Sequence, residues 1–376
     1  MKVGIVLYSP NLFGGGNKLA SELISSLAQN GFSVAVCSFH RPIRGRAYPE
    51  FFEIEDWYAT AEHALLKLNI GKLYRIAFNQ YFTLKKLVKK FKPDVIIGAD
   101  TEPAIMLGQK AKKVMYVHFP TECKTYRHSL RHELYRSLYW WRHYQALREL
   151  DAIVSNSEYT KEITYTLWKT SQPEKSRYHV IYPCVDTRKF RRELERQPKV
   201  CYVGRIDPNK GIEYAIEAFL KVREELKDIK LEIVGGVKGS PWAEKYYPIL
   251  ASKIRNLDGI SLKVDVPEQE IVNTLLTSRC MASFNLEEHF GIVPVEAMAS
   301  GCPPICADGG GQRETIINGK TGFLVRNIEE LAERMRLLLT DDHLFRNMSR
   351  QAREHAKQFD KSVFTRKWIR LLETLC

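Results

Sequence analysis

The chain alternates, twice over, between short runs rich in β-branched residues and longer amphipathic segments. This alternation is typical of βαβ units with right-handed crossovers, which build parallel sheets covered by helices. The predicted strands of the first half are Lys2–Tyr8, Phe32–Ser38, Asp94–Ala99, Val114–His118, Ala152–Ser155 and His179–Tyr182. Those of the second half lie in VCYVG, LEIVG, SLKV, CMASFN, PPICA and TGFLV, and three helical segments follow over residues 329–375. We therefore predict an α/β protein with two Rossmann-like, doubly wound parallel-sheet domains.

A length of 376 residues also favours two hydrophobic cores over one. The segment YPCVDTRKF and the polar run RRELERQPK have the turn residues and charge of a domain junction. We place the first domain at residues 1–185, the second at 186–358, and a C-terminal helix at 359–376 that packs back on the first domain. In doubly wound sheets ligands bind at the carboxyl ends of the strands, so the loops after the strands are the candidate sites.

The net charge of +13 is concentrated in the first half: residues 1–190 carry 28 basic and 17 acidic side chains, and the remaining residues carry 29 and 27. The first domain is therefore expected to face nucleic acid, a phospholipid surface or a phosphorylated substrate.

The eight cysteines form no CxxC pair, and several lie in apolar runs, which favours reduced, buried thiols in a cytoplasmic protein. The opening run MKVGIVLYS is too short for a signal peptide, and no apolar stretch is long enough to span a membrane.

The stretch LEEHFGIVPVEAMASG follows a predicted strand and begins a new helix. Pro294 suits the first turn of that helix, which leaves three backbone N–H groups free at its positive end. These groups belong to Gly291, Ile292 and Val293. Such a helix end is suited to a diphosphate, and Glu296, one turn inside, can accept hydrogen bonds from a ribose diol. Taken alone, Glu288 and Glu296 could equally be two solvated carboxylates beside an ordinary helix start.

Two glycine runs also follow predicted strands. Gly309–Gly311 come directly after PPICA, where glycine lets the backbone approach a ligand closely; a flexible turn is the alternative. Gly14–Gly16 lie between the first strand and the first helix. They lack the GxGxxG spacing of nicotinamide-binding loops, so nicotinamide binding is not predicted.

Together these stretches resemble the retaining GT-B glycosyltransferases of family four, also called glycosyl transferases group 1. The signature of that family is a glutamate, seven residues, a second glutamate and then a glycine-rich loop, which here runs from Glu288 through Glu296 to Gly309–Gly311. The resemblance also covers VGRIDPNKGIEYAIEAF and, near the amino terminus, NLFGGGNKLASEL. It implies two Rossmann-like domains that face each other across a cleft and bind a nucleotide-sugar donor there.

The resemblance implies a role for each matching residue. Arg205 and Lys210 would contact the donor diphosphate and neutralise the charge that develops as the sugar–phosphate bond breaks. Glu288 would bind hydroxyls of the transferred sugar, Glu296 would bind the ribose, and His118 would lie near the reacting sugar. The further predicted donor contacts come from Gly15, Gly16, Gly291, Ile292 and Val293. Without the resemblance, Arg205 and Lys210 are a solvated basic loop and His118 is a structural residue at a strand end.

No metal or other cofactor is expected. The sequence contains no DxD pair of the kind that holds Mg²⁺ or Mn²⁺ on a nucleotide sugar. Basic side chains and a helix amino end would take the place of the cation.

The segments EHFGIVPVEAM and YVHFP most resemble those of mannosyltransferases that extend lipid-linked oligosaccharides from GDP-mannose on the cytosolic membrane face. Enzymes that use UDP-glucose or UDP-N-acetylglucosamine share the scaffold, and base selection depends on loops such as GGVKGS and VDVPEQ. The segments GKLYRIAFNQYFTLKKLVKKFK and KTYRHSLRHELYRSLYWWRHYQALREL mix basic and aromatic residues. We predict that they contact an anionic membrane peripherally; the alternative is an aromatic core with a solvated charged face.

Two other classes of protein share parts of this pattern. A nucleic-acid-binding protein would also interleave basic and aromatic residues, but the second half is nearly neutral and carries no recognition motif, so no nucleic-acid partner is predicted. A GT-B epimerase or a sucrose or trehalose synthase would share the donor site and differ in the acceptor.

Overall fold

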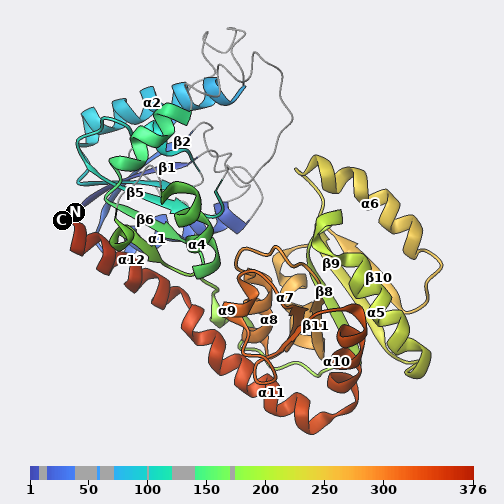
Figure 1. Ribbon diagram of the computed structural model, residues 1–376. Coiled ribbons are helices and arrows are strands. Elements are labelled where there is room, and N and C mark those ends of the chain that lie inside the picture. The colour runs from blue at the N-terminus through green and yellow to red at the C-terminus, as the bar shows by residue number, and fades with distance from the viewer. Residues whose placement is uncertain (8–14, 39–56, 60–71, 100, 121–139, 170–173) are drawn as a thin grey trace. The chain divides into compact units, whose positions relative to one another are not determined.

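The computed structural model describes residues 1–7, 15–38, 57–59, 72–99, 101–120, 140–169 and 174–376. The chain forms two compact units (Figure 1). The first unit comprises Met1–Tyr182 and Phe364–Cys376, and the second comprises Pro183–Val363. Each unit holds one parallel sheet covered by helices, which confirms the predicted α/β class with two doubly wound sheets.

The first unit contains a seven-stranded sheet of order β3-β2-β1-β4-β5-β6-β7. Its strands are β1 (Lys2–Leu7), β2 (Ser33–Ser38), β3 (Trp57–Ala59), β4 (Val95–Ala99), β5 (Lys112–Val117), β6 (Ala152–Ser155) and β7 (Tyr178–Val180). All of them pair in parallel. Strand β3 is absent from the predicted set because its three residues, WYA, are too few to give a strand-like run in the sequence, and pairing with β2 makes them a strand.

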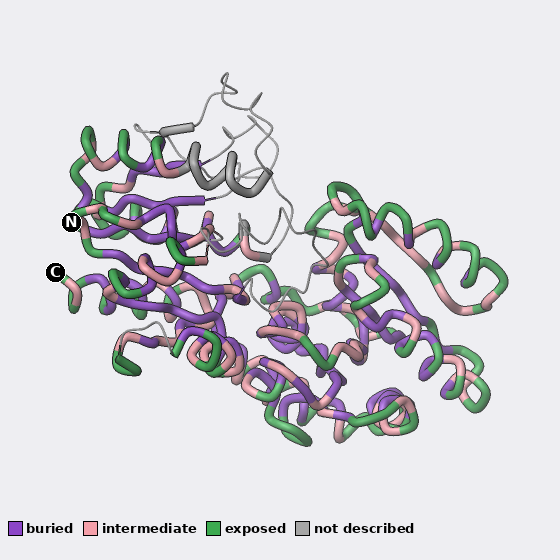
Figure 2. The backbone as a smooth tube through the Cα atoms, turned by 45° about the horizontal axis from the view of Figure 1, so that its top comes forward, coloured by how far each residue is buried: buried purple, intermediate pink, exposed green. Residues whose placement is uncertain are grey.

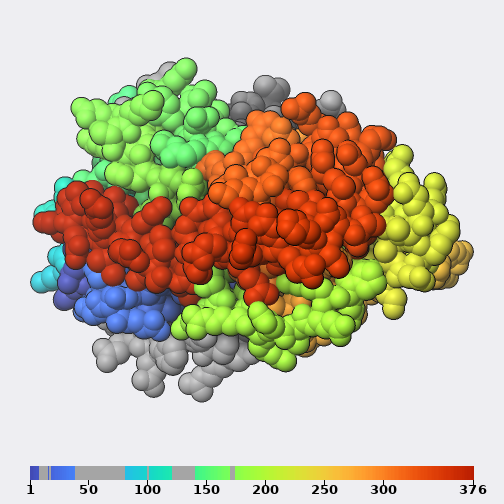
Figure 3. Space-filling model, turned by 90° about the horizontal axis from the view of Figure 1, so that it is seen from below, coloured from blue at the N-terminus to red at the C-terminus, as the bar shows by residue number. Residues whose placement is uncertain are grey.

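The helices of the first unit cover both faces of this sheet (Figure 1). They are α1 (Gly15–Gln29), α2 (Lys72–Phe91), η2 (Pro103–Met106), α4 (Glu158–Trp168), η5 (Lys175–Arg177), and most of α12 (Lys361–Leu375). Residues 140–148 are also helical. Trp368 of α12 is fully buried with its ring 5.3 Å from that of Tyr116, and Thr365 Oγ1 donates to Ser26 Oγ in α1 at 2.9 Å. Figure 3 shows α12, in red, lying against the blue α1 region.

The second unit contains a six-stranded parallel sheet of order β10-β9-β8-β11-β12-β13. Its strands are β8 (Lys199–Arg205), β9 (Lys230–Gly236), β10 (Ile260–Val264), β11 (Cys280–Ser283), β12 (Pro304–Ala307) and β13 (Phe323–Val325). The α-helices are α5 (Ile212–Glu225), α6 (Pro241–Ile254), α7 (Glu268–Thr277), α8 (Ile292–Ser300), α9 (Gln312–Thr315), α10 (Ile328–Thr340) and α11 (Asp342–Ala356). Short 3₁₀ turns are η6 (Thr187–Phe190), η7 (Pro208–Lys210) and η8 (Lys357–Phe359).

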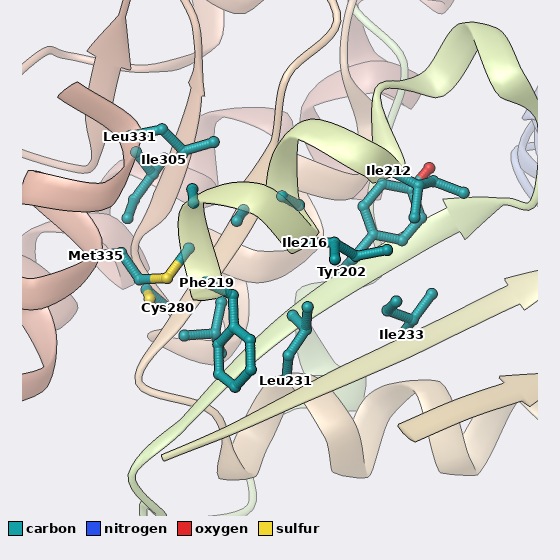
Figure 4. Packing of buried hydrophobic residues seen from close by; sticks show 14 of the residues in the cluster. Tyr202, Ile212, Ile216, Phe219, Leu231, Ile233, Cys280, Ile305, Leu331 and Met335 are labelled. Atoms are coloured by element: carbon teal, nitrogen blue, oxygen red, sulfur yellow. The ribbon is translucent and has the colours of Figure 1, made fainter. Parts of the chain in front are cut away.

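The core of the second unit lies between the sheet and its helices. Apolar residues at helical spacing give α5 a buried face that includes Ile212, Ile216 and Phe219. This face packs on Tyr202 and on neighbouring strand side chains such as Ile233 (Figure 4). Burial of a side chain of this size contributes about 1.5–3 kcal/mol. In Figure 2 the central strands of both sheets are buried, whereas exposed residues follow the outer faces of the helices.

The strand order reverses once in each sheet. In the first unit, β1 is followed by β2 and β3 on one side, whereas β4 lies on its other side. In the second unit, β8 is followed by β9 and β10 on one side, and β11 lies on the other. The crevice outside such a reversal is where doubly wound sheets bind ligands, because the loops that follow the two central strands diverge there. In the second unit it lies beyond the carboxyl ends of β8 and β11.

Candidate active site

The turn after β8 places two basic residues at the strand-order reversal of the second unit. Arg205 ends β8, and Lys210 ends η7. Asp207 starts η7 by accepting a hydrogen bond from the backbone N–H of Asn209 at 3.0 Å. Gly211 then has a left-handed φ of 68°, and a Cβ there would lie 2.0 Å from the carbonyl oxygen of Phe284, so only glycine fits. The turn is thereby held against the carboxyl end of β11.

This packing brings Lys210 to Glu288, which follows β11. Lys210 Nζ donates to Glu288 Oε2 at 2.8 Å. Asn285 Nδ2 donates to the same oxygen at 3.1 Å. The side chains of Lys210 and Glu288 are 37% and 28% exposed, so both remain accessible to a ligand. Two residues of the predicted site therefore meet at the reversal point.

The carboxylate of Glu288 also affects buried groups beneath it. Burial raises the pKa of Tyr202 in β8, and the negative charge of Glu288 raises it further. Burial likewise raises the pKa of the Cys306 thiol in β12, and Glu288 again contributes. Because β8 and β12 flank β11, the carboxylate lies over the middle of the sheet's carboxyl edge.

Arg205 lies at the same edge. Its side chain is exposed, and among the described residues no side chain forms an ion pair with it. Next to it, the loops after β9 and β10 are joined by Asp265, whose Oδ1 accepts from the backbone N–H of Val237 at 2.9 Å and of Lys238 at 3.2 Å. Asp265 itself has a positive φ of 52°. The two loops to which the sequence points for base selection thus form one connected surface.

The glycine run Gly309–Gly311 faces the loop that carries Glu288. A Cβ on Gly310 would lie 2.2 Å from the carbonyl oxygen of Glu288, and one on Gly311 would lie 2.3 Å from that of His289. The backbone N–H of Gly311 donates to the Glu288 carbonyl at 2.8 Å. The close approach that glycine permits is therefore an approach to another segment of the chain, and it holds the backbone of Glu288 in place.

Helix α8 begins beside this loop. Its N-cap is Gly291, with φ 89°, and in the described part of the chain no side chain caps this helix end. Ile292 and Val293 form the start of the first turn, and Pro294 is its third residue, as predicted for a first-turn proline. Glu296 lies about one turn inside the helix and is half-buried. Backbone donors and a carboxylate therefore follow Glu288 along the chain in the predicted order.

In the first unit, His118 follows β5 and lies against the start of α1. A Cβ on Gly16 would be 3.4 Å from the imidazole Cδ2 and Nε2 atoms. Asn156 Nδ2 donates to the His118 carbonyl at 3.0 Å, and the ring lies 4.8 Å from that of Tyr116. Gly15 is the first residue of α1. Gly14 and the segment NLF before it lie outside the described residues.

Three polar residues with contacts at this edge are absent from the predicted site: Asn285 and Gln312 in the region of Glu288, and Asp265 between the loops after β9 and β10. Asn285 touches Glu288 directly, and Gln312 Nε2 donates to the Asn285 carbonyl at 2.7 Å. Asn285 lies at the end of the predicted strand CMASFN, and that position is the one sequence signal that points to it. Gln312 and Asp265 carry no comparable signal, because their contacts are with residues distant in sequence.

Two further features concern the described part of the chain. There, no group of three or more His, Cys, Asp or Glu side chains could hold a metal ion. Likewise, no helix in the described ranges is long and apolar enough to cross a bilayer.

Two Rossmann-like units, with Lys210 and Glu288 at the strand-order reversal of the second, fit the class of GT-B glycosyltransferases. Residues 13–189 match the family described as Glycosyltransferase Family 4, and residues 186–355 match that described as Glycosyl transferases group 1. Together the two matches cover residues 13–355, and the chain belongs to the retaining glycosyltransferases of family four, or group 1.

Solved structures and curated relatives agree with this assignment. Anabaena HepE in complex with UDP-glucose has a TM-score of 0.74 at 17% identity, with both chains fully covered. The sucrose-phosphate synthase of Thermosynechococcus elongatus has a TM-score of 0.77 at 19% identity, over 100% of this chain and 98% of that one. These likenesses confirm the GT-B fold. The human alpha-1,3/1,6-mannosyltransferase is 24% identical over 100% of this chain and 96% of its own length. The D-inositol 3-phosphate glycosyltransferase of Nocardia farcinica is 29% identical, over 57% of this chain and 51% of that enzyme.

Proposed function

We propose that the protein transfers a hexose, with retention of configuration, from a nucleotide sugar to a lipid-linked or other glycan acceptor. GDP-mannose is the proposed donor. The observation that supports this most directly is the Lys210–Glu288 pair at the strand-order reversal, with Nζ and Oε2 2.8 Å apart. A bound diphosphate needs a cation, which Lys210 supplies. The hydroxyl groups of the transferred sugar need a hydrogen-bond acceptor, which the Glu288 carboxylate supplies at the same point.

The proposed chemistry assigns the departing diphosphate to the basic side chains. Arg205 and Lys210 neutralise the negative charge that grows on the leaving group, and the amino end of α8 adds backbone N–H donors. Hydrogen bonds to charged groups contribute about 1.5–3 kcal/mol each. Glu296 accepts from the ribose, and His118 lies near the reacting sugar. In this scheme no metal ion is needed, so turnover should be unchanged in excess EDTA.

GDP-mannose is proposed because the sequence around Glu288 resembles that of mannosyltransferases and because the human relative is named as one. HepE, by contrast, was solved with UDP-glucose, and the Nocardia relative is named for another acceptor. A UDP-sugar-dependent transferase is therefore the second candidate. An epimerase or disaccharide synthase on the same scaffold would differ in its products.

The test is a thermal-shift screen followed by product analysis. GDP-mannose, UDP-glucose, UDP-N-acetylglucosamine and ADP-glucose are compared, because a ligand that binds only the folded state raises the melting temperature. We expect the largest shift with GDP-mannose. A shift confined to uridine nucleotides would overturn the mannose assignment, and a chain stabilised by none of the four would overturn the transferase proposal.

We also propose peripheral contact with the cytosolic face of an anionic membrane through the first unit. The described part of α2 supports this with four exposed lysines and a 49% exposed Phe82. The lysines are Lys85, Lys86, Lys89 and Lys90. Trp141, 57% exposed, is next to Arg142, whose guanidinium lies over the Tyr81 ring of α2. Each lysine near such a surface contributes about 1 kcal/mol. Sedimentation with vesicles containing phosphatidylserine should be lost when the four lysines are changed to glutamate, and unchanged sedimentation would contradict the proposal.

A further inference from the structure

The contacts on the Glu288 carboxylate fall on one of its two oxygens. Lys210 Nζ and Asn285 Nδ2 both donate to Oε2, and among the described residues none donates to Oε1. The carboxylate is therefore held from one side, with its second oxygen left for another donor. In the proposed function that donor is a hydroxyl of the transferred sugar.

The two donors on Oε2 differ in what else they must do. Lys210 is the proposed ligand of the donor diphosphate, so its ammonium group has to serve the nucleotide as well as Glu288. Asn285 carries no charge and has no proposed contact with the nucleotide. Its amide can orient the carboxylate without competing with the phosphate oxygens, because each N–H points in a fixed direction from a planar group.

Asn285 is itself held by a buried side chain. Gln312 is 1% exposed, and its Nε2 donates to the Asn285 carbonyl at 2.7 Å. The other atom of that amide, Gln312 Oε1, is buried without a hydrogen-bond partner in the part of the chain that the structure describes. A buried acceptor without a partner is destabilising. A glutamine here thus serves the contact with Asn285 and does not improve the packing of the core.

We propose that Asn285 and Gln312 are positioning residues for the transfer reaction: Gln312 fixes the backbone at Asn285, and Asn285 fixes the carboxylate of Glu288 toward the sugar. The glycine run behind this loop supports the arrangement, because Gly309 lies so close to Leu286 that a Cβ would be 2.6 Å from its carbonyl oxygen. The proposal rests on the proposed function, since it assigns Glu288 to the sugar part of the donor.

The first test compares two ligands on one variant. Dissociation constants of Asn285→Ala are measured by calorimetry for GDP-mannose and for GDP, or for UDP-glucose and UDP if the wild type binds uridine nucleotides. Because Glu288 is assigned to the sugar, we expect about tenfold weaker binding of the nucleotide sugar and less than a twofold change for the nucleoside diphosphate. Asn273→Ala, which removes a half-buried amide on α7, is the matched control and should change neither.

The outcomes separate the two proposals. Equal weakening of both ligands, or no weakening of either, would overturn the positioning role. A wild-type chain that binds neither nucleotide sugar would instead overturn the proposed function. That result comes from the wild type alone and does not depend on the Asn285 variant.

The second test separates positioning from stability. Gln312→Met keeps the length of the side chain, removes the unpartnered Oε1 and loses the bond to Asn285. We expect a melting temperature equal to or above that of the wild type together with a five- to tenfold lower kcat. A kcat that is unchanged, or one that falls only together with the melting temperature, would overturn the role of Gln312.

Discussion

Both units place a glycine beside a predicted catalytic residue, but the two contacts differ in kind. In the second unit a Cβ on Gly310 would lie 2.2 Å from the backbone oxygen of Glu288. In the first unit a Cβ on Gly16 would lie 3.4 Å from atoms of the His118 ring. Backbone cannot move aside as a side chain can, so the site in the second unit is fixed by its own packing, whereas that in the first can adjust. The same fold therefore supports one preformed and one adaptable group of residues.

The largest effect is expected from Gly310→Ala. The added methyl group meets the Glu288 backbone, and Gly310 also has a left-handed φ of 54°. We expect a loss of about 2–4 kcal/mol in the stability of the second unit and more than a hundredfold loss in kcat/KM. The measurements are thermal unfolding and steady-state kinetics.

Gly319→Ala is the matched control. Its φ of 73° is also left-handed, but nothing lies within 4 Å of the added Cβ. It should lose only about 1–2 kcal/mol, from the backbone conformation alone, and keep its activity. Equal effects of Gly310→Ala and Gly319→Ala would mean that close packing does not fix the site in the second unit.

An intermediate effect is expected from Lys210→Ala. Loss of one charge-assisted contact with the diphosphate should lower kcat tenfold to a hundredfold. Stability should change by less than about 1 kcal/mol, because partly exposed ion pairs contribute little. Lys221→Ala removes a similar surface pair, with Nζ 3.4 Å from Glu329 Oε1, and should leave kcat unchanged. If both variants kept wild-type turnover, the diphosphate would have to bind elsewhere.

The smallest effect is expected from Gly16→Ala. A contact of 3.4 Å is tight but falls on a side chain, and the helix start accommodates alanine readily. We expect less than a threefold change in kcat/KM and no loss of stability. The control is His118→Ala, which removes the ring itself and should lower turnover more than Gly16→Ala does. A Gly16→Ala variant as damaged as Gly310→Ala would show that the two sites are equally rigid and would remove the contrast between the units.

The predicted and observed strands agree closely because their signal is local. Six strands of the first sheet and six of the second are predicted from short apolar runs, and each predicted run overlaps an observed strand. Strand β3 escapes prediction because pairing with β2, and not its own sequence, makes it a strand. Pro294 is likewise predictable in the first turn of α8, since its missing N–H is a property of the residue alone.

The sequence by itself determined the class of fold and the strand ends at which chemistry-bearing residues occur, because side-chain periodicity and the special backbones of glycine and proline act over a few residues. Only the tertiary structure decided which of those residues meet. Lys210 and Glu288 are 78 positions apart, and their contact depends on β8 and β11 being neighbours across the reversal of strand order. The same holds for Gln312 and Asn285, 27 positions apart. Strand order is set by the packing of the whole sheet, and no local pattern encodes it.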